Sequence, residues 1–447
     1  MREIAVKKLP RDPGPAAWNA LLEPAHASAP LEEAITADVL IIGAGFAGLS
    51  AARRLSLKAP GARIVVLDAT RVGEGPAGRN SGFMIDLPHD LASDDYGGQI
   101  ARDRRQTWAN RQAIQFALQA AADYEMPDEA IRQSGKINGA ATQKGLAHNQ
   151  SYADHLIALE EPFELLDAGA MKALTGIEYY QGGLFTPKAA MLQPALYVRG
   201  LAGGLTACGV SLHENAPVVS LSRSGPDWQA TTPNGKVTAP RAILAVNGHL
   251  ESFGFFKCQL MHVFTYASMT KALSEAEVLA LGGENVWGLT PADPMGTTVR
   301  RISGIGGDRI VVRNRFTYDP SMEVSEARIK AVSRDHDRSF AARFPMLEGT
   351  EMAYRWGGRL CLSRNDVPAF GEIEQGLFAA CCQNGLGTAK GTLSGMAAAD
   401  LALGEMSEEA ALLLEEPAPS HLPPEPIAWL GANAYIRWSE FEAGREL

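Results

Sequence analysis

Cysteine is scarce in this sequence, and long apolar runs are missing from it. The 447 residues include five cysteines, an odd number without metal-ligand spacing, which indicates a reducing compartment and not a disulfide framework. No stretch stays apolar long enough to cross a bilayer. The opening MREIAVKKLPRDPG carries charge and proline where a secretory signal has an apolar run. We therefore expect a soluble, cytoplasmic protein with no bound metal and no membrane span.

Basic residues are too few to balance the acidic ones. Lys and Arg number 41 against 51 Asp and Glu, a formal net charge of −10. Such a chain repels a phosphate backbone, so we expect no nucleic-acid partner. With 46% hydrophobic and 21% charged residues, the composition is typical of a chain with a large core. The length exceeds what one core usually supports and predicts two packed subdomains.

A glycine-rich turn stands between a predicted strand and a predicted helix near the N-terminus. The stretch VLIIGAGFAGLSAARRL places Gly43, Gly45 and Gly48 in G-x-G-x-x-G spacing, and ARIVVLDA predicts the next parallel strand. These glycines allow a tight turn, close approach of a pyrophosphate and close helix packing. Asp68 follows 20 positions after Gly48, the offset at which a carboxylate binds ribose hydroxyls. The pattern predicts a dinucleotide site and argues against a 2′-phosphate.

The segment after this βαβ unit bears on which dinucleotide is bound. It contains Arg79, Asn80, Ser81 and Gly82 in a long glycine-rich loop, which offers backbone donors and a cation near a large ring system. A simple nicotinamide enzyme usually continues into another strand and helix instead. GIGGDR at Gly304 is interpreted as a turn, so a second complete fingerprint is missing. We expect FAD, with electrons entering from an organic substrate.

The rest of the chain alternates between β-rich and helical segments. We expect β-rich segments at residues 218–247 and 259–315 and helices at residues 99–124, 325–344 and 390–403. Residues 1–35 are rich in Pro and Ala and lead into the first strand, so we expect function to lie elsewhere. The tail from Glu415 is predicted to be a packing arm.

Once the loop at Arg79 is considered with the glycine triplet, the sequence resembles a known family, the D-amino-acid oxidase-type FAD-dependent oxidoreductases. Within this family, the sequence is similar to the glycine and sarcosine oxidase-like members. It is nearest to the gamma-glutamylputrescine oxidase-like members. The resemblance extends from about Ala37 to Gly404. It rests on VLIIGAGFAGLSAARRL, AGRNSG, AILAVNG, and the distal pair WGGRLCLSRNDVPAFGEI and NGLGTAKGTLSG. Together these segments are far more specific than the glycine triplet alone.

The resemblance implies an α/β fold with two parts. One is a Rossmann-like FAD-binding domain, and the other is a discontinuous substrate domain of antiparallel sheet plus helices. The implied FAD-binding domain comprises residues 36–83, 191–255 and 351–404, and the substrate domain residues 84–190 and 256–350. An N-terminal arm, residues 1–35, and a C-terminal extension, residues 405–447, flank them.

The resemblance also implies which residues hold noncovalent FAD. For the ADP half they are Gly43, Gly45, Phe46, Ala47, Gly48, Asp68 and Ala69, with the Val218 backbone on the adenine side. For the flavin and ribityl chain they are Arg79, Asn80, Ser81 and Gly82, with Asn247 and Gly248 after the buried strand. The distal loop is Gly385, Leu386, Gly387 and Thr388, near the pyrimidine end. This loop precedes a small-residue helix, whose dipole would stabilise negative charge on the reduced flavin.

Family members of this kind move a hydride from the α-carbon of an amine to flavin N5, leaving an imine that water hydrolyses. Alignment of the C–H bond over the ring supplies much of the rate, so no acid–base pair is required. Arg301 in TTVRRISG resembles a substrate-face position that clamps a carboxylate, with a solvated arginine as the alternative. Further candidates for substrate contact are His89, Tyr266, Trp287 and Trp356, with structural histidine or core packing as the alternative.

Several features stay open from the sequence. Some sarcosine oxidases attach flavin through a cysteine in the stretch that matches Cys361, but the flanking residues differ, so we expect a buried, inert thiol. The electron acceptor is O2 or an acceptor protein, and oligomer formation is undecided. Two other functions remain: a 2-hydroxy-acid or polyol dehydrogenase, and an FAD-binding subunit of a hetero-oligomeric dehydrogenase.

Overall fold

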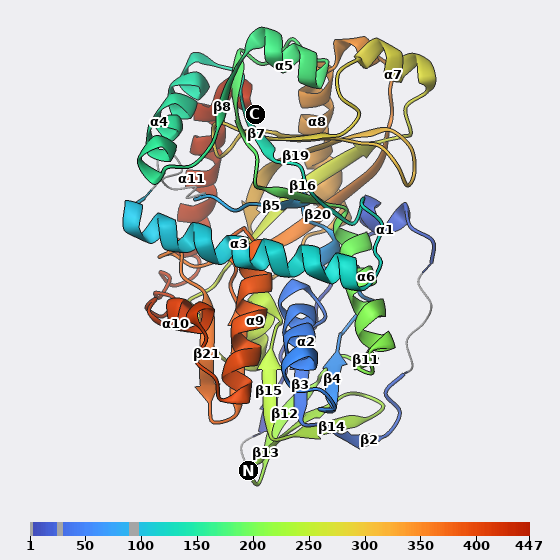
Figure 1. The fold of residues 1–447 in the computed structure, drawn as a ribbon, viewed down its shortest axis with the longest axis vertical. Helices are drawn as coiled ribbons and strands as arrows, with labels where there is room; N and C mark the ends of the chain where they lie inside the picture. The colour runs from blue at the N-terminus through green and yellow to red at the C-terminus, as the bar shows by residue number, and fades with distance from the viewer. Residues whose placement is uncertain (1–2, 25–29, 89–97) are drawn as a thin grey trace.

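The computed structural model describes residues 3–24, 30–88 and 98–447. Two bodies lie one above the other along the long axis (Figure 1). The lower body is built on a six-stranded sheet and the upper body on an eight-stranded sheet. The long helix α3 (Ile100–Asp123) runs across the molecule between them.

The six-stranded sheet is parallel except for one edge strand. Its order is β11 (Ser211–His213), β4 (Ile64–Leu67), β3 (Val39–Ile42), β15 (Arg241–Leu244), β22 (Leu377–Cys381) and β21 (Ala369–Glu374), which is antiparallel. Along β3, Val39 and Ile41 pack into one core cluster, whereas Leu40 and Ile42 pack into another. Because side chains alternate between faces, a continuous apolar strand has both faces buried.

Helices cover one face of this sheet and a second sheet covers the other. The helices are α2 (Phe46–Lys58), α6 (Pro194–Ala207) and α9 (Ala389–Leu403), with α3 packed behind them. The second sheet has the order β1 (Glu3–Ala5), β12 (Ser220–Ser224), β13 (Asp227–Thr231), β14 (Lys236–Ala239) and β2 (Ala34–Thr36). The lower body is thus a three-layer arrangement, as the predicted Rossmann-like domain requires.

The eight-stranded sheet carries the upper body. Its order is β20 (Met352–Leu362), β16 (Met261–Thr270), β19 (Arg309–Tyr318), β18 (Thr298–Ile302), β17 (Trp287–Pro291), β7 (Lys136–Ala140), β9 (Gly182–Thr186) and β8 (Glu164–Asp167). Neighbours are antiparallel except for β17 and β7. Helix α8 (Glu326–Arg343) buries Phe340 against this sheet. A small sheet joins β5 (Phe83–Met84), β10 (Ala190–Leu192) and β6 (Ile131–Gln133).

One predicted domain boundary falls a strand too early. Residues 351–404 were expected in the FAD-binding domain, but β20 pairs along its length with β16 of the upper sheet. The return to the six-stranded sheet begins with β21 at Ala369. Sheet membership depends on which distant strand pairs with β20, and a short apolar run does not encode its partner.

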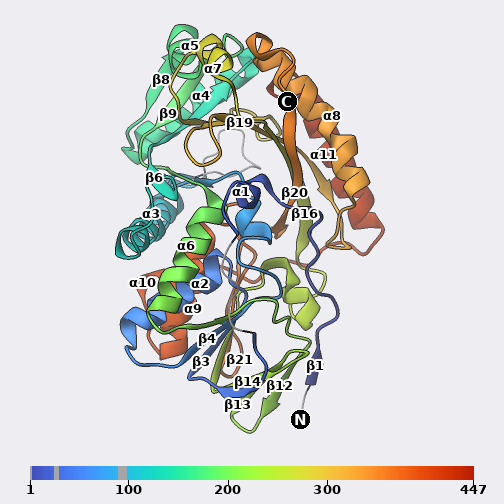
Figure 2. The same ribbon diagram turned by 90° about the vertical axis from the view of Figure 1, so that its right-hand side faces the viewer.

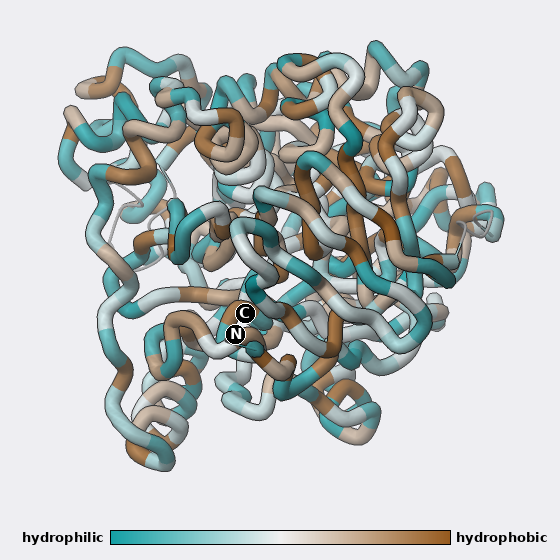
Figure 3. The backbone as a smooth tube through the Cα atoms, turned by 90° about the horizontal axis from the view of Figure 1, so that it is seen from below, coloured by the Kyte–Doolittle hydropathy of each residue, from teal (hydrophilic) through white to brown (hydrophobic). Residues whose placement is uncertain are grey.

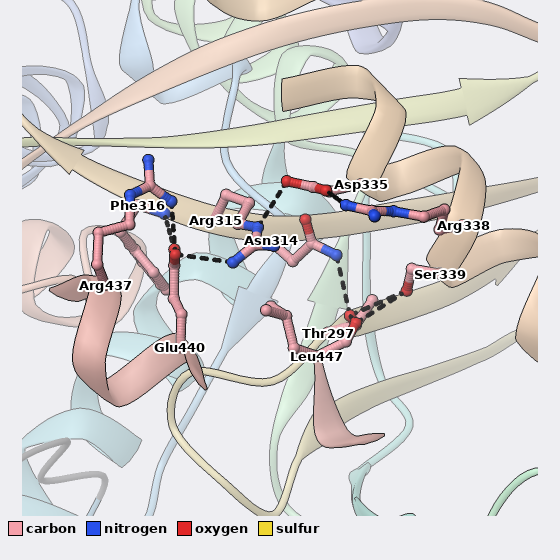
Figure 4. Close-up of polar contacts among 10 residues, drawn as sticks. All are labelled: Thr297, Asn314, Arg315, Phe316, Asp335, Arg338, Ser339, Arg437, Glu440 and Leu447. Atoms are coloured by element: carbon pink, nitrogen blue, oxygen red, sulfur yellow. Dashed lines mark hydrogen bonds and ion pairs between the residues drawn. The ribbon is translucent and has the colours of Figure 1, made fainter. Parts of the chain in front are cut away.

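The C-terminal extension packs on the upper body. Helix α11 (Ile427–Ala443) carries Glu440, whose buried carboxylate accepts hydrogen bonds from Arg315, Arg437 and the Phe316 amide (Figure 4). The last residue, Leu447, accepts from Thr297 and Ser339 through its carbonyl oxygen. The other helices are α1 (Ala17–Ala20), α4 (Gln143–Leu159), α5 (Ala168–Thr175), α7 (Glu275–Leu281) and α10 (Glu408–Leu414).

Hydrophobic and hydrophilic stretches alternate at short intervals along the chain (Figure 3). In the described part of the chain, no helix is both long and apolar enough to cross a membrane. The apolar residues instead gather in separate core clusters around the two large sheets.

Candidate active site

The turn after β3 lies against the end of β15. Gly43 has φ +107°, a backbone region that favours glycine, and a Cβ there would lie 2.5 Å from the carbonyl oxygen of Ala245. A Cβ on Gly48 would collide with the carbonyl oxygen of Gly43. Both positions therefore need glycine for α2 to begin, with Gly45 as its N-cap, this close to the sheet.

A second turn, after β22, leads into α9. Gly385 has φ +79°, and a Cβ on Gly387 would meet nothing within 4 Å. Thr388 donates a 2.6 Å hydrogen bond to the carbonyl oxygen of Phe83 and so ties this turn to β5. On α9, a Cβ on Gly395 would collide with the carbonyl oxygen of Ala47 on α2. The two helices are therefore in backbone contact, and their N-terminal ends lie together.

The first amides of α2 and α9 lack side-chain caps. Six other helices, α4 to α8 and α10, each begin with a side chain that accepts a hydrogen bond from an N-terminal amide. Among the described residues, none caps α2 or α9 in this way, and neither helix has an acidic residue in its first turn. Uncapped amides at a helix N-terminus attract negatively charged groups. These two helix ends thus offer donors to a ligand beside them.

One cavity is bounded by both turns. Of the residues predicted to bind the cofactor, those that line it are Gly43, Gly45, Phe46, Ala47, Asp68, Ala69, Arg79, Asn80, Ser81, Val218, Asn247, Gly385, Gly387 and Thr388. The predicted residues outside its lining are Gly48, Gly82, Gly248 and Leu386. The three glycines are covered by protein atoms: Gly48 by Gly43, Gly82 by Arg300 and Gly248 by His262. The structure therefore brings together segments more than 300 positions apart.

Comparison with known proteins identifies the family. A model of the family described as DAO, FAD dependent oxidoreductase, matches residues 38–401. The chain belongs to the DAO family of FAD-dependent oxidoreductases. The match covers β3 with its turn and all but the last two residues of α9, so it includes both glycine turns of the cavity.

Two relatives and one solved structure are similar to this chain over most of its length. The chain is 28% identical over 393 residues to a probable oxidoreductase OrdL of Haemophilus influenzae, covering 84% of this chain and 85% of the relative. It is 25% identical over 395 residues to gamma-glutamylputrescine oxidoreductase of Escherichia coli, covering 84% and 85%. The crystal structure of glycine oxidase from Geobacillus kaustophilus superimposes with a TM-score of 0.69 at 17% identity, covering 87% of this chain and 100% of that one.

The cavity fits the cofactor of the DAO family. Gly387 leaves open space beside the first turn of α9, and the nearest atom to a Cβ on Gly45 would be Ala77 Cβ at 3.7 Å. The Thr265 hydroxyl lines the cavity and has no hydrogen-bond partner in the described part of the chain, although it is buried. Such a group needs a partner. Open amide cradles at two helix N-termini and an unpaired hydroxyl suit a ligand with phosphates and a polar ring.

Asp68 lies at the end of β4 as predicted. Its carboxylate accepts hydrogen bonds from the Ala44 amide at 2.8 Å and from the Thr70 amide at 2.9 Å. Burial raises the pKa of Asp68, and these hydrogen bonds act in the opposite direction. Oδ1 also accepts from the Thr70 hydroxyl at 3.1 Å, so the remaining lone pair is on Oδ2, which can still accept from a ribose hydroxyl in the cavity.

Arg79 lines the cavity but serves mainly to shape it. Its guanidinium donates to the carbonyl oxygens of Glu74, Pro13, Gly14 and Gly357. Burial lowers the pKa of Arg79. The loop after the βαβ unit is thus held in place by one of its own carbonyl oxygens and by main-chain acceptors from two other parts of the chain, residues 13–14 and Gly357.

A buried pair, Arg359 and His249, forms another part of the wall. Arg359 donates to Nε2 of His249 over 2.6 Å and to the carbonyl oxygen of Met322 over 3.1 Å. An arginine cannot accept, so Nε2 of His249 accepts and its proton is on Nδ1, facing the Ser252 hydroxyl at 3.1 Å. Burial and the charge of Arg359 lower the pKa of His249 to about 2. His249 is therefore neutral at physiological pH.

The described residues that were predicted to contact substrate lie outside the lining of the cavity. Arg301 is 1% exposed and donates to the carbonyl oxygens of Gly282 and Glu284, away from the cavity lining. Its Nη2 also lies 3.5 Å from a carboxylate oxygen of Asp308, so its charge is already paired within the protein. Its neighbour Arg300 turns to the opposite face and donates to the carbonyl oxygens of Ser81 and Gly82. Successive strand residues face opposite ways, and the sequence did not show which arginine faces the nucleotide body.

The predicted aromatic walls are core residues. Tyr266 bonds the Thr317 hydroxyl over 2.7 Å, and Trp356 donates to the carbonyl oxygen of Arg79 over 3.0 Å. Trp287 lies in the core cluster under α8. None of the three is among the lining residues of the described cavity. The remaining candidate, His89, lies outside the described residues.

Sequence reasoning missed several lining residues. Four belong to the N-terminal arm, for which no role was expected: Val6, Lys8, Leu9 and Pro10. Others are Thr265, Arg359 and His249, whose segments were noted without assigning these side chains. The run of charge and proline at the start of the chain was the one available signal for the arm. It indicates an extended segment but does not indicate where that segment lies.

Proposed function

We propose that this chain oxidises the C–N bond of a small amine or amino acid, using FAD bound noncovalently in the cavity between the two glycine turns. The observation that carries the proposal is the joint lining of one cavity by the turn after β3 and the turn after β22. The substrate class is supported by gamma-glutamylputrescine oxidoreductase and glycine oxidase, since both are named for compounds with a C–N bond.

When bound, FAD supplies the acceptor for a hydride from the carbon next to the nitrogen. The residues of the chain bind, orient and exclude water around the reacting groups. The unpaired Thr265 hydroxyl can orient a neutral amine, and the neutral His249 leaves that amine unprotonated. We assign Arg359, in place of Arg301, as the cation that an anionic substrate group would meet, because Arg359 lines the cavity.

The environment of Cys361 supports noncovalent binding. Cys361 lines the cavity and is 2% exposed. A hydrogen bond with Cys382 and burial hold the pKa of the Cys361 thiol well above its usual range. A protonated thiol is a poor nucleophile. Denaturing the purified protein with acid should therefore release all of the flavin into the supernatant, whereas flavin that stays with the pellet would contradict this part of the proposal.

An anaerobic titration tests the function. The purified yellow protein is mixed with amines, amino acids and 2-hydroxy acids, and the flavin absorbance near its visible maximum is followed. The proposal expects bleaching by at least one amine or amino acid and none by hydroxy acids. Bleaching by hydroxy acids alone would assign the protein to the 2-hydroxy-acid dehydrogenases. A colourless protein that takes up no FAD would overturn the cofactor as well.

The electron acceptor is O2 or an acceptor protein. Admitting air to the bleached sample separates the two. The flavin of an oxidase is reoxidised by O2 and regains its colour within the turnover time, whereas the flavin of a dehydrogenase stays reduced until its own acceptor is added. Light scattering on the same sample reports whether the chain forms an oligomer.

A further inference from the structure

The N-terminal segment lies along the cavity although it precedes the family region. That region begins at residue 38, yet Val6, Lys8, Leu9 and Pro10 line the cavity. Figure 2 shows the segment rising from β1, beside the five-stranded sheet, to α1 near the eight-stranded sheet. It therefore runs along one wall from the lower body to the upper body.

The lower end of the segment is held by main-chain pairing. Strand β1 pairs antiparallel with β12. Beyond it, the Val6 amide donates to the carbonyl oxygen of Val219 over 2.9 Å, and the Lys7 amide donates to that of Ser252 over 3.0 Å. These contacts place Val6 beside Val218, on the side of the cavity where the adenine is expected.

The upper end is held by a buried tryptophan. Trp18 is fully buried, and its Nε1 donates to the carbonyl oxygen of Asn80 over 2.9 Å. Its ring packs edge-on against Trp356, with centroids 6.4 Å apart. Asn80 itself lines the cavity in the loop predicted to lie along the flavin. The segment is thus attached beside both ends of the expected ligand.

Between these ends, Asp12 faces two buried arginines. Its carboxylate lies 3.9 Å from Arg359 Nη2, with side chains 7% and 5% exposed. Its charge also acts on Arg79, whose guanidinium donates to the carbonyl oxygens of Pro13 and Gly14. Arg79 and Arg359 both line the cavity. Two buried cations without a nearby anion repel each other, so the Asp12 carboxylate favours the attached position of the segment.

We infer that residues 4–18 form a clamp that retains FAD, with Asp12 fastening the clamp to Arg359 across the cavity wall. The inference rests on FAD as the ligand of this cavity, as in the proposed function, and does not depend on which substrate is oxidised. Dissociation of FAD then requires the clamp to detach from the wall, which lowers the rate of release. The clamp lies outside the matched family region, which begins at residue 38.

The release rate of FAD from the full-length holoprotein tests the clamp. Asp12→Asn removes the charge that faces Arg359, and Trp18→Phe removes the hydrogen bond to Asn80. The matched control is Arg11→Gln, an exposed neighbour outside the cavity lining. Each holoprotein is diluted, and the rise in flavin fluorescence gives the release rate. We expect release about tenfold faster for the two clamp variants and unchanged for Arg11→Gln.

A second measurement distinguishes a clamp from general loosening. The urea midpoint of each apoprotein is compared with that of the wild type. Faster release with an unchanged apoprotein midpoint supports the clamp. Release at the wild-type rate overturns it, and so does faster release that comes with an equal loss of apoprotein stability. A wild-type chain that binds no FAD overturns the proposed function itself, whereas equal release rates overturn the clamp alone.

Discussion

The carboxylate of Asp68 at the end of β4 accepts a 2.8 Å hydrogen bond from the Ala44 amide in the turn after β3. This bond ties two neighbouring parallel strands together at the point where the cavity opens. It fixes the first glycine turn and leaves an acceptor facing the cavity.

Replacing Asp68 should weaken FAD binding more than it weakens the fold. Asp68→Ala removes the acceptor of the Ala44 amide and the acceptor for a ribose hydroxyl, each worth about 1 kcal/mol. We expect the Kd for FAD to rise by about tenfold or more, measured by fluorescence titration of the apoprotein. The control is Asp38→Ala, which removes an exposed partner of Arg63. An equal rise in Kd for both variants would contradict a specific role for Asp68.

The close contact between α2 and α9 predicts opposite effects for two Gly→Ala substitutions. Gly395→Ala places a Cβ against the carbonyl oxygen of Ala47, so the helices must separate at a cost of about 1–3 kcal/mol. Gly203 lies on the exposed face of α6, and a Cβ there would meet nothing within 4 Å. Gly203→Ala should therefore raise the free energy of unfolding by about 0.5–1 kcal/mol. Urea unfolding checks both. A Gly395→Ala variant as stable as the wild type would show that the helices do not pack this closely.

Protonation of His336 should make the protein lose stability in mild acid. His336 on α8 is 1% exposed and bonds the Ser268 hydroxyl over 2.7 Å, and burial lowers its pKa from 6.5 to about 4. As the pH falls from 6.5 towards 4, the unfolded chain binds a proton that the folded chain excludes. Stability present above pH 6.5 is then lost at about 1.4 kcal/mol per pH unit.

The His336→Gln variant isolates this contribution. Its unfolding free energy should fall less steeply between pH 6.5 and 4 than that of the wild type. His421→Gln, at an exposed position, serves as the control and should keep the wild-type slope. Parallel curves for all three proteins would exclude His336 as the source of the acid sensitivity.

The buried Glu440 carboxylate should hold α11 on the upper sheet. It accepts from Arg315 at 2.8 Å, Arg437 at 2.6 Å and the Phe316 amide at 2.9 Å (Figure 4). Glu440→Gln turns an amide donor towards two arginines. We expect the free energy of unfolding to fall by about 2–3 kcal/mol. The loss is limited to this range because Arg315 keeps Asp335 as a partner. Proteolysis should then cut the C-terminal extension faster. Glu442→Gln, exposed on the same helix, should change neither quantity.

Elements with strong local patterns were predictable from the sequence. Gly43 and Gly48 stand where a β-carbon would meet the backbone of the same short unit, so their spacing predicts the turn by itself. The helical period of residues 99–124 and 325–344 predicts α3 and α8 to within a residue or two. The turn and the helices both depend on residues only a few positions apart, and such patterns can be recognised in the sequence itself.

The sequence by itself determined the βαβ turn, the acidic residue at its proper offset and the presence of a second glycine turn before a small-residue helix. Only the tertiary structure decided that these turns meet in one cavity, that β20 joins the upper sheet, and that Arg359 lines the cavity while Arg301 does not. It also placed the N-terminal arm on the cavity wall. The physical reason is that turn and helix preferences are local, whereas strand pairing, the face on which a side chain lies and the docking of an extended segment depend on partners hundreds of residues away.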